Sequence, residues 1–266
     1  MLNPLACMTS GYHGHGLERV FEGIARAGFR YVELVAGPAL APRIDADNLT
    51  KASLESLRRM LANFGLFPIS VAGHTNLVAP DGPALFRCRL ELAAAVGARI
   101  VNTGCGHTES KEEERRFFSI MPDLARYAER LGIVIALETH GGLTGTGPDA
   151  RMTLERIGSP FVKVNYDTAN VIYYRGVRPE EDLPHIVDQV AHVHLKDKLG
   201  GQGEYNFPAL GEGSIDFHQI VSALADVGYL GPFSVEIEVE GERTAEEEDA
   251  LRARLYQYAS ALLDLA

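Results

Sequence analysis

Cysteine is scarce in this chain of 266 residues, where Cys7, Cys88 and Cys105 are an odd set of three with no CxxC spacing. Such a set excludes a disulfide framework and a zinc ribbon, and it indicates reduced thiols in a cytoplasm. No apolar run approaches the about 18 residues that cross a membrane, and no basic N-terminal region precedes a long apolar stretch. We therefore expect an unexported cytoplasmic protein with no membrane partner.

Basic residues are also in deficit. Lys and Arg number 25 against 36 Asp and Glu, which gives a formal net charge of −11. Because contacts from Lys and Arg to phosphates supply most of the affinity for nucleic acids, this balance argues against a nucleic-acid partner. No GxGxxG or P-loop motif follows a predicted strand, so we expect no nucleotide cofactor.

Short apolar runs alternate with helical patterns along the whole chain. Hydrophobic residues make up 46% of it, with no compositional break, which favours one domain over residues 1–266. Several helical patterns end in glycine just before a run, as at Gly97 and Gly132. Eight such units in this length predict an α/β fold, a closed (β/α)8 TIM barrel. The predicted strands cover residues 5–8, 31–35, 68–72, 99–103, 133–138, 162–167, 190–196 and 233–237.

Acidic or imidazole side chains lie near the ends of the last four predicted strands. Glu138, Asp167, His194 and Glu236 are separated by 29, 27 and 42 residues, which are lengths of a strand, loop and helix. Acids packed together in a barrel repel one another unless a cation compensates them. Three carboxylates and one imidazole suit Mn, Mg, Co or Fe better than a thiolate-type zinc site, with zinc still open. We therefore predict one divalent metal ion held by these four residues.

Other polar residues near the strand ends are candidates for substrate contacts. A single Glu or His at a strand end is more often structural than a metal ligand, and the metal prediction rests on the recurrence of such residues over four strands. We predict substrate-binding roles for His74, His107, His140 and Lys196; Lys196 shares the inward parity of His194 and could stabilise an oxyanion. His192, deeper on the same strand, is left open between a core and a supporting role. The segment 197–216, without helical pattern, is expected over the barrel mouth.

Five motifs from the last four predicted strands and the segments around them span about half of the chain. The motifs are LETHG (137–141), NYDTAN (165–170), HVHLKD (192–197), LGEGSIDF (210–217) and GYLGPFSVE (228–236). Together they resemble the sugar phosphate isomerase/epimerase superfamily with xylose isomerase-like barrels, whose members include inosose dehydratases and isomerases, ketose 3-epimerases, 3-dehydroshikimate dehydratases and endonuclease IV. The resemblance implies that Glu138, Asp167, His194 and Glu236 match the shared metal ligands, with Mn, Mg, Co or Zn as the usual ion.

Two departures from these relatives narrow the expected activity. Ketose 3-epimerases usually carry a His three residues after the metal-binding Asp and an Arg six residues after the metal-binding His. This chain has Asn170 and Gly200 there. Endonuclease IV also has a His at the first of these positions, so Asn170 breaks its three-metal cluster, although His74 and His107 resemble its early histidines. An ordinary ketohexose 3-epimerase and a DNA-repair enzyme are both disfavoured.

The resemblance and the four predicted ligands lead to one expected chemistry. We expect a metal-dependent isomerase or epimerase of a sugar, keto-sugar or cyclitol, with Glu138 and Glu236 as the acid/base pair that moves a proton through an enediolate. The alternatives are a dehydratase of a keto-cyclitol or 3-dehydroshikimate-like substrate, an abasic-site endonuclease, and a barrel retained as a binding or structural protein. A homo-oligomer is compatible with these features but not specified by them.

Overall fold

The computed structural model describes residues 3–12, 14–37, 42–106, 108–238, 241 and 243–264. In it, eight parallel strands form a closed barrel in chain order, and the last strand pairs back with the first. This confirms the predicted (β/α)8 barrel. The strands are β1 (Leu5–Met8), β2 (Tyr31–Val35), β3 (Phe67–Ala72), β4 (Ile100–Thr103), β5 (Val134–Glu138), β6 (Val162–Asp167), β7 (Val190–Leu195) and β8 (Phe233–Val235).

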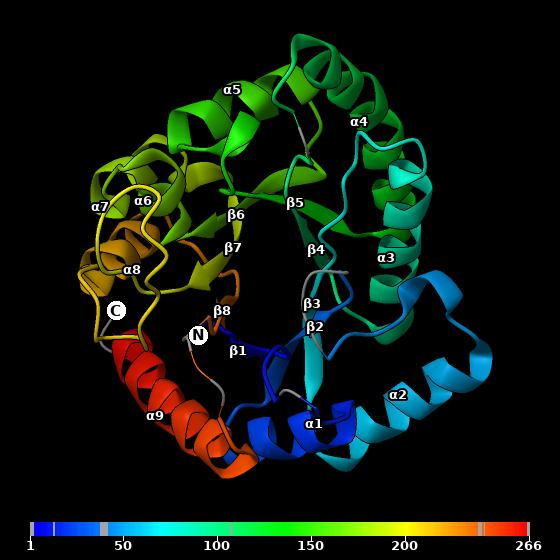
Figure 1. The fold of residues 1–266 in the computed structure, drawn as a ribbon. Helices are drawn as coiled ribbons and strands as arrows, with labels where there is room; N and C mark the ends of the chain where they lie inside the picture. The colour runs from blue at the N-terminus through cyan, green and yellow to red at the C-terminus, as the bar shows by residue number, and fades with distance from the viewer. Residues whose placement is uncertain are drawn as a thin grey trace.

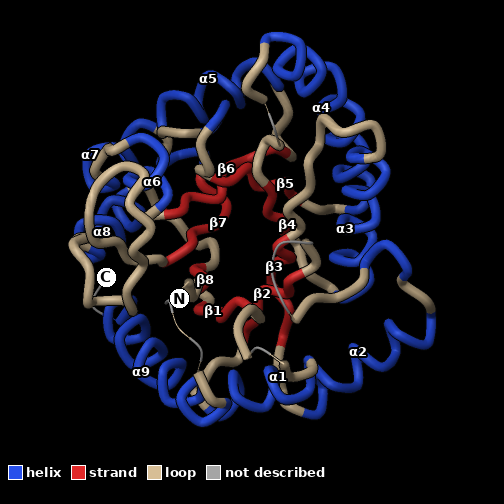
Figure 2. The backbone as a smooth tube through the Cα atoms, viewed as in Figure 1, coloured by secondary structure: helices blue, strands red, loops and turns tan. Residues whose placement is uncertain are grey.

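Helices form an outer ring around the strands (Figures 1 and 2). Two of them, α3 and α4, end at Gly97 and Gly132, whose φ angles of +86° and +67° are left-handed and suit glycine. No described helix has the length and apolarity that a membrane span requires. The helices are α1 (Leu17–Arg26), α2 (Lys51–Asn63), α3 (Gly82–Val96), α4 (Lys111–Leu131), α5 (Gly147–Ile157), α6 (Asn170–Arg175), α7 (Pro179–Asp182), α8 (Phe217–Asp226) and α9 (Ala245–Asp264).

Strand alternation separates an apolar outer core from a polar interior. On β2, Val32 and Leu34 pack in the main hydrophobic core, whereas Glu33 between them points into the barrel and contacts His194. Barrel interiors are usually filled by branched aliphatic side chains. Here one level of the interior, which we call the polar layer, consists of fully buried polar residues. Its members are Glu33, Ser70, Asn102, Asn165, His192 and Ser234.

Strand register brings the predicted ligands to the same end of the barrel. Glu138 on β5 is paired with Asn165 on β6, and Asp167 on β6 is paired with His194 on β7. His194 in turn is paired with Ser234 on β8, and Glu236 follows directly after that strand. The carboxyl ends of β5 to β8 therefore present these side chains at one mouth.

The segment that joins β7 to α8 is held by one carboxylate. Asp197 accepts backbone N–H groups from the two ends of this segment, at 2.8 Å from Lys198, 2.9 Å from Gly211 and 2.8 Å from Gly213. In between, the backbone N–H of Gly203 donates to the carbonyl of Tyr173 on α6 at 2.9 Å. The segment thus lies over α6, at one side of the mouth (Figure 1).

Candidate metal centre at the barrel mouth

The four predicted metal ligands converge around one ring nitrogen. The ligand atoms of Glu138, Asp167 and His194 all lie within 4.8 Å of one another. Glu236 is not part of that group of three, but its Oε2 is 2.9 Å from Nδ1 of His194. The same Nδ1 is 3.4 Å from Oε2 of Glu138 and 3.8 Å from Oδ2 of Asp167. All four side chains are buried.

Amide groups hold two of the carboxylates in place. Glu138 accepts hydrogen bonds from Nδ2 of Asn170 at 2.9 Å and from Nδ2 of Asn165 at 3.1 Å. Oδ1 of Asp167 accepts the backbone N–H groups of Ala169 at 2.9 Å and of Asn170 at 2.8 Å. Asn170, the position that departs from the epimerase pattern, therefore orients both Glu138 and Asp167.

The remaining carboxylate oxygens leave capacity for a cation. Among the described residues, Oδ2 of Asp167 and Oε2 of Glu236 are buried with no hydrogen-bond partner. Nζ of Lys196 lies within ion-pair range of both, at 3.0 Å and 3.3 Å. Buried acceptors without donors are rare and costly in folded proteins. Two such oxygens beside an imidazole form an oxygen-rich donor set that fits a divalent ion.

Cationic neighbours keep the acids of this cluster ionised. Burial by itself raises the pKa of Glu138, but the charges of His74 and His194 outweigh it and lower the pKa to about 2. Burial is likewise outweighed at Glu236, where Lys196 and His194 lower the pKa to about 2. In return, the carboxylates hold the pKa of Lys196 well above its ordinary value despite its burial. Glu138 and Glu236 are therefore anionic, and His74, His194 and Lys196 supply the positive charge beside them.

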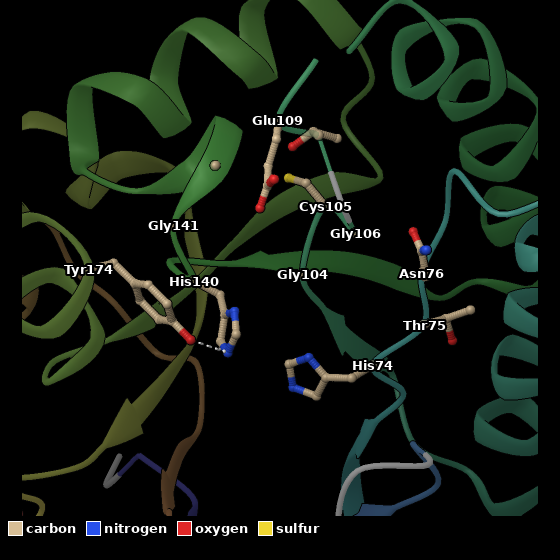
Figure 3. Close-up of a pocket in the computed structure, with 12 residues that line it drawn as sticks. His74, Thr75, Asn76, Gly104, Cys105, Gly106, Glu109, His140, Gly141 and Tyr174 are labelled. Carbon is tan, nitrogen blue, oxygen red and sulfur yellow. Dashed lines mark hydrogen bonds between the residues drawn. The ribbon is translucent and has the colours of Figure 1, made fainter. Parts of the chain in front are cut away.

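A cavity of about 510 Å³ opens beside this cluster. His74 and His140, two of the predicted substrate contacts, line it together with Tyr174 (Figure 3). Nε2 of His74 is 3.2 Å from Oε2 of Glu138, and Nε2 of His140 is 2.9 Å from the hydroxyl of Tyr174. The cavity therefore reaches the metal cluster through His74.

The other two predicted substrate contacts have different outcomes. Lys196 does not line the cavity; it lies among the acids, with Nζ 5.1 Å from the ring centre of Phe207 in the β7–α8 segment. His107 lies outside the described residues.

Three residues near the site were missed by sequence reasoning. Glu33 is buried in β2 beside His194, and an acid at an inward position of an apolar strand was the signal. Glu238, three residues past β8, has its carboxylate 3.6 Å from Nζ of Lys196. Burial raises the pKa of Glu238 to about 7, and its shared parity with Glu236 was the signal. Glu109, on a loop without a sequence signal, points into the cavity (Figure 3).

His192, whose role the sequence left open, belongs to the polar layer. Its Nδ1 is 2.8 Å from Oδ1 of Asn165, and its Nε2 is 3.0 Å from Oγ of Ser234. Burial lowers the pKa of His192 to about 4. A neutral His192 thus supports Asn165, which in turn donates to Glu138.

Comparison with known proteins places this chain in a family. Residues 21–257 match the model of the xylose isomerase-like TIM barrel family, and the chain belongs to that family. The chain is similar to the L-ribulose 3-epimerase of Methylomonas sp. (strain DH-1), with 26% identity over 238 residues that cover 83% of this chain and 78% of that protein.

Two further comparisons give a second relative and a solved structure with the same fold. The chain is 28% identical to the inosose dehydratase of Clostridium beijerinckii over 166 residues, which cover 55% of this chain and 54% of that protein, about half of its length. A solved xylose isomerase-like TIM barrel protein from Mycobacterium smegmatis in complex with magnesium superposes with a TM-score of 0.79 at 20% identity. That match covers 99% of this chain and 97% of the other and shows a shared fold.

Proposed function

We propose that this protein is a divalent-metal-dependent isomerase or epimerase of a sugar, keto-sugar or cyclitol. The proposal is carried by the convergence of Glu138, Asp167, His194 and Glu236, which would hold one ion of Mn, Mg, Co or Zn. When bound, a divalent ion supplies a Lewis acid for the carbonyl and adjacent hydroxyl of a polyol. The epimerase relative supports the reaction class.

In the proposed reaction, Glu138 and Glu236 move the proton. Glu138 ends β5 and Glu236 follows β8, and their low pKa keeps both carboxylates anionic at neutral pH. One removes the proton from the carbon beside the carbonyl, whose oxygen takes up the electron pair to give an enediolate. The other, once it has taken up a proton from solvent water, delivers that proton to the opposite face for epimerisation or to the neighbouring carbon for isomerisation, and the first then releases its proton to solvent.

The remaining mouth residues would bind and orient the substrate. The ammonium of Lys196, beside Asp167 and Glu236, is placed to donate to an oxyanion as it develops. His74 and His140 line the cavity, where they would contact substrate hydroxyls, and His107 is proposed as a further contact. Changing any of these four to Ala should raise KM or lower kcat without removing the metal.

The test combines metal analysis of the purified protein with deuterium uptake from D2O. A panel of keto-sugars, inososes and 3-dehydroshikimate would be incubated with the metal-loaded protein. Glu138→Gln and Glu236→Gln should each abolish uptake, with some loss of metal, whereas Glu155→Gln, an exposed change on α5, should not. Turnover of a substrate with no exchangeable carbon-bound proton would contradict the proposal.

A second candidate is a dehydratase of a keto-cyclitol or a 3-dehydroshikimate-like substrate. The similarity to inosose dehydratase favours it. The first proton removal is the same, but the electron pair then expels a β-hydroxyl, which leaves as water after protonation. Mass spectrometry of the same reactions separates the two, since only a dehydratase yields a product lighter by one water.

A further inference from the structure

The polar layer beneath the proposed metal site contains a carboxylate with a specific geometry. We propose that Glu33 is a positioning residue that holds the proton on Nε2 of His194 and so turns the lone pair of Nδ1 toward the metal. This inference rests on the proposed metal site. It assigns a function to a residue of β2, whereas all four proposed ligands come from β5 to β8 or directly follow β8.

Both oxygens of the Glu33 carboxylate approach the ring of His194. Both carboxylate oxygens of Glu33 are 3.1 Å from Nε2 of His194. Both residues are fully buried, and they are 161 residues apart in the chain. Nδ2 of Asn102 donates to Oε1 of Glu33 at 2.8 Å, which fixes the carboxylate from the β4 side. Glu33 therefore has little freedom to turn away from the ring.

The chemistry of the two groups determines where the proton lies. A carboxylate only accepts hydrogen bonds, and a neutral imidazole has one donor nitrogen and one acceptor nitrogen. Carboxylates face both ring nitrogens; in the metal-bound protein the ion would neutralise those at Nδ1, so the favourable arrangement puts the lone pair of Nδ1 on the ion and the remaining proton on Nε2, toward Glu33. The opposite arrangement would point the Nε2 lone pair at a negative charge.

The other nitrogen of the ring, Nδ1, faces the remaining proposed ligands, as a nitrogen that binds the same ion would. Nδ1 faces the carboxylates of Glu236, Glu138 and Asp167, at 2.9, 3.4 and 3.8 Å. Nδ2 of Asn165 lies at similar distances from both ring nitrogens, 3.2 Å from Nδ1 and 3.3 Å from Nε2, so the tautomer is set by the metal and Glu33 rather than by this amide. Carboxylates behind metal-bound histidines fix the tautomer and the ring orientation and raise the basicity of the ligand.

The layer offers a matched control. Ser70 is also fully buried in the polar layer, and its Oγ is 3.2 Å from Nε2 of His192 rather than His194. Ser70 is paired with Glu33 in the register of β2 and β3, so Ser70→Ala is a control beside Glu33 that removes a contact with His192 and keeps both Glu33 and His194. Glu33→Gln keeps an acceptor and the shape but removes the charge, and Glu33→Leu removes both.

Two measurements test the proposal. Calorimetric titration of the metal-free proteins with Mn²⁺ should give an affinity lowered about 10- to 100-fold for Glu33→Leu, an intermediate loss for Glu33→Gln, and a wild-type value for Ser70→Ala. In the Zn²⁺-loaded wild-type protein, ¹H–¹⁵N spectra of labelled histidine should show the proton of His194 on Nε2. Thermal unfolding identifies any variant that does not fold.

Each outcome decides the question. Wild-type affinity in both Glu33 variants, or metal-bound Nε2 in the spectra, would overturn the positioning role and leave the proposed function intact. If Glu33→Leu does not fold, the affinity of Glu33→Gln decides alone: a loss supports the role and no change refutes it. A wild-type protein that binds no divalent ion would refute the proposed metal site itself.

Discussion

Glu138 contacts four side chains from other segments of the chain. It accepts from Asn165 and Asn170, and it lies within ion-pair distance of His74 and His194. Sequence reasoning found this residue because an acid at the end of an apolar strand is conspicuous. The amide partners were not predictable in the same way, since they come from β6 and the start of α6, which meet Glu138 only in the closed barrel.

The low pKa of Glu138 predicts how the metal-free protein responds to acid. Because the folded-state pKa of about 2 lies below the ordinary value of 4.5, this group adds stability that is full above about pH 4.5 and is lost as pH falls toward 2. The full contribution is about 3 kcal/mol. Urea unfolding in EDTA at pH 5.5 and pH 3 should show a smaller loss of stability for Glu138→Gln than for wild type. Equal losses would contradict the assignment.

The ammonium of Lys196 is the basis of a second prediction. Replacing it with Met keeps the apolar stem but removes the ammonium that lies 3.0 Å from Asp167 and 3.3 Å from Glu236. Catalysed exchange should fall about 100-fold or more, the typical effect of losing an oxyanion donor. Metal content should persist or rise because a competing cation is gone.

The control for Lys196 is another lysine of the barrel. Lys163 on β6 donates to Gln189, away from the acids, so Lys163→Met should change neither activity nor metal content. Unchanged exchange in Lys196→Met, or loss of its metal, would be the contradicting result.

Among the elements, the β7–α8 segment depends most on a single side chain. Asp197→Ala removes the acceptor of several backbone N–H groups and should lower the free energy of unfolding by about 2–4 kcal/mol. Cleavage by a protease within residues 199–206 should accelerate as well. Asp226→Ala, an exposed change at the end of α8, serves as the control. An Asp197→Ala protein as stable and as resistant as wild type would exclude the clamp.

The strands and long helices were predictable because their patterns are local. Gly132, for example, correctly marked the end of a helix in the sequence, and α4 ends at Leu131 directly before it. Short α6 and α7 have too few residues for a period to appear, and the sequence did not locate them individually. The position of the β7–α8 segment over α6 depends on contacts such as Gly203 to Tyr173, which no local pattern encodes.

At the scale of the whole molecule, the net charge of −11 bears on the choice of substrate. The carboxylate of Glu109 also points into the cavity (Figure 3). Anionic substrates should therefore be repelled, and neutral sugars should not. Raising the ionic strength from about 0.01 to about 0.1 M shortens the Debye length from about 30 to about 10 Å.

Over that range, kcat/KM at saturating metal should rise for a carboxylate such as 3-dehydroshikimate and stay constant for a neutral ketose. Glu109→Gln should reduce the salt effect on the carboxylate. A salt-independent rate with the anionic substrate would contradict this electrostatic prediction.

Closure of the barrel has a consequence for how the molecule refolds. The side chain of Asn3, beside β1, bonds to Gly231 across 228 residues of chain, and Glu33 meets His194 across 161. Contacts between such distant segments form slowly because long loops must close first. A chain diluted from denaturant should regain helical signal before it can capture Mn²⁺ with native affinity. The rate at which full affinity is regained would then report when Glu33 on β2 meets His194 on β7.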